Sequence, residues 1–76
     1  MKPEDIRELL EANPFKPIRI HLSDGKAFDL THPDMVIVSR SKIILGVPNE
    51  PGSRIADRVG HCSLLHIVRL EEMQAA

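Results

Sequence analysis

The sequence predicts a mainly β domain of the α+β class, with one N-terminal helix packed on a bent, barrel-like antiparallel sheet of about five strands. Three observations lead to this fold class. Apolar residues follow helical spacing near the start of the chain, then alternate with polar residues in two segments, and later form two short continuous runs. Because a chain of 76 residues is too short to divide into two cores, we expect a single domain over residues 1–76.

The first expected element is a helix from about residue 3 to residue 12. Pro3 suits the first turn of a helix, where its missing N–H group would have no partner in any case. Three apolar residues then recur at helical spacing and form one stripe that should cover an end of the sheet. They are Ile6, Leu9 and Leu10. Asn13 followed by Pro14 predicts the end of the helix.

The sheet is expected to span about residues 17–71, in segments separated by residues that favour turns. Residues 48–53 hold two prolines and a glycine, and they predict a loop that extends to about Arg58. The expected strands are residues 18–22, 26–30, 35–38, 43–47, 59–64 and 65–70, the last two being short and joined by a tight turn. Residues 72–76 are expected to be a frayed tail.

The pairing of the first two strands follows from their alternation. A two-residue turn would set the apolar face of one strand against the polar face of the other, since a one-residue slip inverts every side chain. A three-residue loop with Gly25 at positive φ instead pairs Ile20 with Phe28. The same register places Arg19 opposite Asp29 on the outer face. We therefore predict the three-residue loop.

The core should consist of aliphatic side chains, because the chain has only two aromatic residues. The runs Met35–Val38 and Ile43–Val47 are too apolar for strands with one face in water, so both faces are expected to be covered. Another copy that pairs with an open strand edge would provide such cover. The sheet residues expected to be largely buried are Ile20, Leu22, Phe28, Ile37, Ile44, Leu64 and Ile67.

Two segments resemble a group of small bacterial proteins of unknown function. Residues 14–25 match the pattern Pro-Phe-x-Pro-x-Arg-Ile-x-Leu-x-Asp-Gly, and residues 64–67 read Leu-Leu-His-Ile. The resemblance covers most of the chain, and it implies no activity.

The order of elements is also similar to that of the Sm-like family, which includes the bacterial Hfq proteins. That resemblance implies a small SH3-like barrel and an RNA-binding ring. In Hfq proteins a Lys-His pair precedes the last strand, whereas this chain has Leu65 before His66. No aromatic residue for base stacking lies between Met35 and Leu45. The resemblance therefore implies the fold more strongly than it implies the RNA site.

The charge balance gives no general attraction to nucleic acid. The net charge is −1 and the isoelectric point is about 6.4, whereas nucleic-acid-binding domains usually carry a basic surplus. One group of residues could form a local anion or RNA surface if the fold brought its members together. It consists of Arg40, Lys42, Arg54, Arg58 and His66. The alternative interpretation is that these are ordinary solvated turn residues.

The sequence predicts no enzyme, no metal site and no cofactor. His61, Cys62 and His66 are the densest set of metal-ligating types, yet a structural zinc site needs four ligands. His61 and Cys62 are neighbours, and neighbours on a strand point to opposite faces. The acidic residues are accounted for by turns and by the expected pair of Asp29 with Arg19.

Two hypotheses for function remain, and both are non-enzymatic. The first is a homo-oligomeric binding or assembly module that acts through contacts with an unidentified protein partner. The second, ranked lower, is an Sm-like, Hfq-like subunit of an RNA-binding ring. A single cysteine and the lack of any apolar run of membrane-spanning length favour a cytoplasmic protein that does not enter a membrane.

Overall fold

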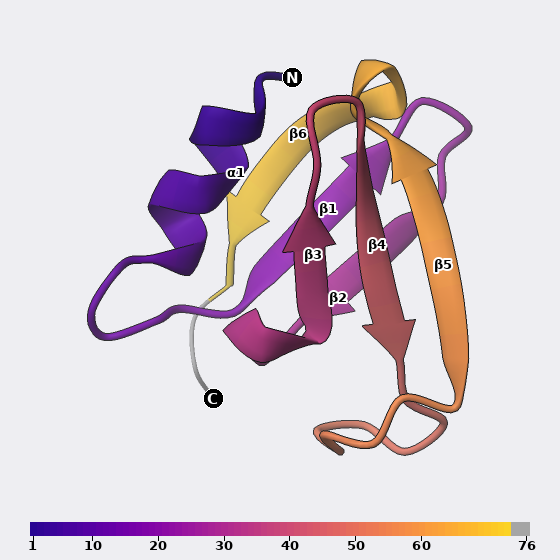
Figure 1. The fold of residues 1–76 in the computed structure, drawn as a ribbon. Coiled ribbons are helices and arrows are strands. Elements are labelled where there is room, and N and C mark those ends of the chain that lie inside the picture. The colour runs from indigo at the N-terminus through magenta and orange to yellow at the C-terminus, as the bar shows by residue number, and fades with distance from the viewer. Residues whose placement is uncertain (74–76) are drawn as a thin grey trace.

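The computed structural model describes residues 1–73, and within them the chain forms one α-helix and six strands (Figure 1). The helix is α1, Pro3–Leu10, and two short 3₁₀ turns are η1, Pro33–Met35, and η2, Leu64–His66. The strands are β1, Ile18–Leu22; β2, Ala27–Leu30; β3, Val36–Val38; β4, Lys42–Val47; β5, Arg58–Ser63; and β6, Ile67–Glu72.

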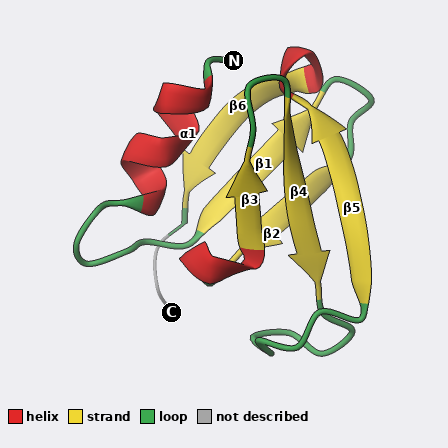
Figure 2. Cartoon of the chain, viewed as in Figure 1, coloured by secondary structure: helices red, strands yellow, loops and turns green. Residues whose placement is uncertain are grey.

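The strands form two antiparallel sheets of three, in the orders β2-β1-β6 and β3-β4-β5. The α+β prediction is therefore confirmed, whereas the expected closed barrel of about five strands is wrong over residues 1–73. The two 3₁₀ turns provide the physical reason. The chain passes between the sheets at η1 and again at η2, and each turn interrupts the strand that would have continued across. Pro33 contributes at η1, because it has no N–H group to donate to a ladder. Figure 2 shows both turns as helical segments between strands.

The β1–β2 hairpin has the predicted register. Ile20 lies opposite Phe28, and Arg19 lies opposite Asp29. The Leu22 N–H group donates to the Lys26 carbonyl at 2.9 Å, so the pairing extends to these two residues and the loop between them has three residues. Gly25 has a φ of +89°, in the left-handed region that favours glycine. The register predicted from the alternation of apolar and polar residues is therefore confirmed.

The core lies between the two sheets, and α1 contributes Ile6 to it. The buried residues are Ile6, Ile18, Ile20, Leu30, Ile43, Leu45, Cys62, Leu64 and Ile67. Of the sheet residues predicted to be largely buried, Ile20, Leu64 and Ile67 are confirmed, whereas Leu22, Phe28 and Ile44 are half-buried. In the helix stripe, Ile6 is buried, and Leu9 and Leu10 are half-buried.

The prediction for Ile37 is wrong, because 64% of this residue is exposed. Strand β3 follows ordinary alternation, so Val36 and Val38 face the core and Ile37 faces outward. The apolar run predicts a strand covered on both faces, whereas in this chain one of its faces is open.

The ends of two elements differ from the sequence-based bounds. The helix ends at Leu10 and not at residue 12; Glu11 is its C-cap residue, and the N–H group of Glu11 makes a final helical hydrogen bond to the Arg7 carbonyl at 2.9 Å. Glu72, predicted to belong to a frayed tail, lies in β6 opposite Ile18. Residues 74–76 of that predicted tail lie outside the described residues. Among residues 1–73, no helix has the length and apolar character needed to cross a membrane.

Candidate functional site

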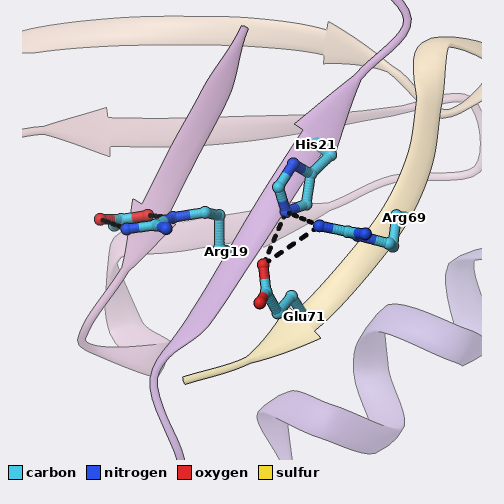
Figure 3. A network of polar contacts seen from close by, with 5 residues as sticks. Arg19, His21, Arg69 and Glu71 are labelled. Carbon is cyan, nitrogen blue, oxygen red and sulfur yellow. Dashed lines mark hydrogen bonds and ion pairs between the residues drawn. The ribbon is translucent and has the colours of Figure 1, made fainter. Parts of the chain in front are cut away.

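The outer face of the β2-β1-β6 sheet carries a network of charged side chains (Figure 3). The guanidinium of Arg19 donates to the carboxylate of Asp29 through Nε at 2.7 Å and through Nη2 at 3.1 Å. On the other side of β1, His21 Nε2 lies 2.9 Å from Glu71 Oε1. Arg69 Nη2 lies 3.1 Å from the same His21 nitrogen and 3.3 Å from the same Glu71 oxygen. Side chains from all three strands thus meet on this face.

The charged side chains of this face form hydrogen bonds with one another. When His21 Nε2 carries a proton it donates to Glu71, and when it carries none it accepts from Arg69. The hydrogen bond with His21 lowers the pKa of the Glu71 carboxyl, and the hydrogen bond from Arg19 lowers the pKa of Asp29. Both carboxylates are therefore charged at neutral pH and already paired.

The outer face of the β3-β4-β5 sheet has the opposite character. Across the three strands, Ile37 lies opposite Ile44, which lies opposite His61, and Gly46 lies opposite Val59. We call these five residues the apolar face. Ile37 and Val59 are 64% and 62% exposed, and among residues 1–73 no member of the apolar face forms an ion pair. Ile37 and Val59 are strongly exposed aliphatic side chains, Ile44 between the outer strands is half-buried, and Lys42 and Ser63 continue the rows of Ile44 and His61 at one end. Exposed apolar side chains on one face of a sheet are typical of a contact surface.

The loop before β5 approaches one end of the apolar face, at Gly46. A Cβ atom added at Gly46 would lie 3.0 Å from the Cβ of Ala56 and 3.2 Å from the Cε of Met35, so both side chains flank that glycine. Ile55, the neighbour of Ala56, is 73% exposed. The absence of a side chain at Gly46 therefore lets the loop approach the sheet.

The five predicted basic residues do not form one patch. Lys42 lies opposite Ser63 at one end of β4, and Arg58 lies opposite Val47 at the other end. The two ends of β4 are five residue steps apart, which corresponds to about 17 Å. Arg40 precedes Lys42 in the same turn.

His66 belongs to the Lys42 end of the molecule. The N–H group of Leu64, in the same 3₁₀ turn, donates to the Ser41 carbonyl at 2.9 Å. His66 also holds the first hairpin loop, because its carbonyl accepts from the Ser23 N–H group at 2.8 Å and its Nδ1 lies 3.2 Å from Ser23 Oγ. The predicted group is thus split into Arg40, Lys42 and His66 at one end and Arg58 at the other, with Arg54 in the loop that leads to Arg58.

The predicted His and Cys set is divided between the two faces of β5. His61 is exposed on the apolar face, whereas Cys62 is a buried free thiol in the core. Burial raises the pKa of the Cys62 thiol, and the negative charge of Asp24 adds to the effect. Among residues 1–73, no three His, Cys, Asp or Glu side chains are grouped so that they could hold a metal ion.

A cleft of about 690 Å³, which no sequence pattern predicts, lies beside β2. Its walls are β2 on one side and the loop of residues 48–53 on the other, and Leu45 and Val47 of β4 also line it. His32 Nε2 contacts the Gly52 carbonyl at 2.9 Å and ties the loop to the end of β2. The breaker-rich loop was predicted, but its approach to β2 depends on contacts between distant segments.

Comparisons with known proteins leave the family open. No protein-family model, no curated protein and no solved structure matches this chain.

Proposed function

We propose that this protein is a small binding and assembly module that acts through protein–protein contacts, and that it associates with further copies of itself through the apolar face. The observation that carries the proposal is the contrast between the two outer faces. One face holds Arg19, Asp29, His21, Glu71 and Arg69 in internal pairs. The other presents exposed isoleucine and valine side chains without an ion pair among the described residues.

The energetics support association through that face. Full burial of an aliphatic side chain contributes about 1.5–3 kcal/mol. Covering Ile37 and Val59 would therefore favour association by a few kcal/mol before the entropic cost of bringing two molecules together. Association would also explain why residues 35–38 are all apolar although one side of β3 is exposed, since a second copy would cover that side.

Sedimentation velocity over a range of concentrations tests this proposal. We expect the wild-type protein to associate, and we expect Val59→Lys to remain a monomer at the same concentrations. Val68→Lys is the matched control, because Val68 is 61% exposed on the other sheet, at the register shift in β6. A wild-type protein that stays monomeric, or a loss of association in both variants alike, would contradict the proposal.

RNA binding is the second candidate, and the grouping of Arg40, Lys42 and His66 favours it. The N-terminal ammonium group lies at the same end, with its nitrogen 3.3 Å from the Leu64 carbonyl oxygen. Several positive charges at one end could neutralise phosphates even in a chain with a net charge of −1.

Binding of a single-stranded RNA at several salt concentrations tests this candidate. If it holds, Arg40→Glu combined with Lys42→Glu abolishes a salt-sensitive interaction. Arg54→Glu combined with Arg58→Glu makes the same change in charge near the opposite end of β4 and leaves binding intact. Equal losses in the two double variants would indicate only a general charge effect.

A further inference from the structure

The free edge of β2 offers backbone hydrogen-bonding groups to a partner. Within residues 1–73, β2 is an outer strand of its sheet and pairs only with β1 (Figure 1). The Leu22 N–H group donates to the Lys26 carbonyl at 2.9 Å, which makes these two a hydrogen-bonded pair. Because such pairs alternate along an antiparallel ladder, the N–H and C=O groups of Ala27 and Asp29 point away from β1. Among residues 1–73 no other segment bonds to them.

The cleft of about 690 Å³ lies along this edge. Phe28 and Leu30 of β2, Leu45 of β4 and Pro48 of the loop give it an apolar lining. A strand added to β2 would place alternate side chains toward this lining and the others on the outer face beside Asp29. The edge thus combines free main-chain groups with a site for alternate side chains, which is the arrangement that β-strand addition requires.

We propose that an extended peptide segment of a partner protein adds to the free edge of β2, with apolar side chains in the cleft and a basic side chain beside Asp29. The inference rests on the proposed role in protein–protein contacts, but it uses a surface other than the apolar face. Charge identifies the occupant further. Arg19 donates to both carboxylate oxygens of Asp29, yet 47% of the Asp29 side chain stays exposed. A lysine or arginine on the added strand can therefore share this carboxylate with Arg19, whereas an acidic residue beside it is repelled.

A second copy fits this edge less well than a single extended segment. The loop of residues 48–53 lies across the cleft from the β2 edge, and the contact of His32 with the Gly52 carbonyl holds the loop there. In a symmetric β2-to-β2 pairing each copy would bring its own loop against the edge of the other. A single extended chain avoids that obstruction.

The first experiment uses pools of fluorescently labelled hexapeptides in which lysine alternates with a varied apolar residue. A matched pool has glutamate in place of lysine. We expect the lysine pool to bind at least about ten-fold more tightly than the glutamate pool, and Asp29→Lys to reverse that preference. Binding should shift the amide NMR signals of Ala27 and Asp29. Equal affinity of the two pools, or no binding of either, would overturn the proposal.

Methylation of the peptide backbone gives a control that leaves the protein unchanged. In an added strand every second peptide N–H group faces β2 and the others face solvent. N-methylation of one alternate set should weaken binding by about ten-fold or more, and N-methylation of the other set should leave it unchanged. Equal effects of the two sets would contradict strand addition.

Self-association through this edge would appear as a shift of the Ala27 and Asp29 amide signals with protein concentration alone. That result would assign the edge to a second copy and overturn the peptide proposal. Self-association through the apolar face is tested separately, by sedimentation of the Val59→Lys variant. Peptide binding by a monomeric Val59→Lys variant would therefore support the β2 site whether or not the wild-type protein self-associates through the apolar face.

Discussion

Arg19 and Asp29 form a two-point ion pair across β1 and β2, with nitrogen–oxygen distances of 2.7 and 3.1 Å. On the opposite side of the same two strands, Ile20 is buried against the core and lies opposite Phe28. The polar pair outside and the apolar pair inside both require the same register. A one-residue slip would break both at once, which is why so short a hairpin has a defined pairing.

The Arg19–Asp29 pair predicts a specific dependence of stability on pH. The hydrogen bond from Arg19 lowers the pKa of Asp29 below its ordinary value of 3.8. The pair therefore stabilises the fold above that ordinary value, and the stabilisation is lost as the pH falls through the lower pKa of the folded state. Urea unfolding should show Asp29→Asn to be less stable than wild type near neutral pH, with a difference that shrinks toward zero in strong acid.

Asp34→Asn is the control for this pH experiment. Asp34 lies in η1 and forms no ion pair among residues 1–73. Its replacement should leave the difference from wild type constant over the same pH range. A difference for Asp29→Asn that stays constant with pH would show that the ion pair does not stabilise the fold.

The hairpin loop predicts a cost for a side chain at Gly25. Gly25 has a φ of +89°, so Gly25→Ala should lower the free energy of unfolding by roughly 1 kcal/mol or more. Gly60 is the matched control, because a Cβ atom there would meet only the Val47 side chain, at 4.0 Å. Gly60→Ala should be neutral or stabilising by up to about 1 kcal/mol. Thermal or chemical unfolding of the two variants would reveal equal losses if the loop did not need glycine.

The arrangement of β3 and β4 predicts unequal costs for two isoleucines in one sheet. Ile43 is fully buried, so Ile43→Ala should cost about 2–5 kcal/mol through lost contacts and the cavity left behind. Ile37 is 64% exposed, and Ile37→Ala should cost less than about 1 kcal/mol in the monomer. Chemical unfolding at a concentration where the protein is monomeric measures both. Similar losses would place Ile37 in the core after all.

Local patterns predicted what local interactions determine. The alternation around Gly25 was sufficient to place Ile20 opposite Phe28, because both strands and their turn lie within thirteen residues. The helix at residues 3–10 was found for the same reason, since spacing and a proline define it.

Features that depend on distant segments were not predicted. Periodicity shows that residues 35–38 are apolar, but it does not show that the outward side of Ile37 lacks a cover within the chain. The split of the basic residues depends on the pairing of β4 with β5, which sets Lys42 and Arg58 at opposite ends. The cleft beside β2 requires the loop of residues 48–53 to lie against a strand about twenty residues earlier.

The central claim is that the apolar face is a surface of contact between copies, and methyl NMR with a soluble paramagnetic probe tests it most directly. The probe reports whether the methyl groups of Ile37 and Val59 are open to solvent. At low micromolar concentration we expect strong broadening of both signals, and near millimolar concentration we expect protection, while Val68 stays equally broadened throughout. Equal broadening of Ile37 and Val59 at both concentrations would contradict the claim.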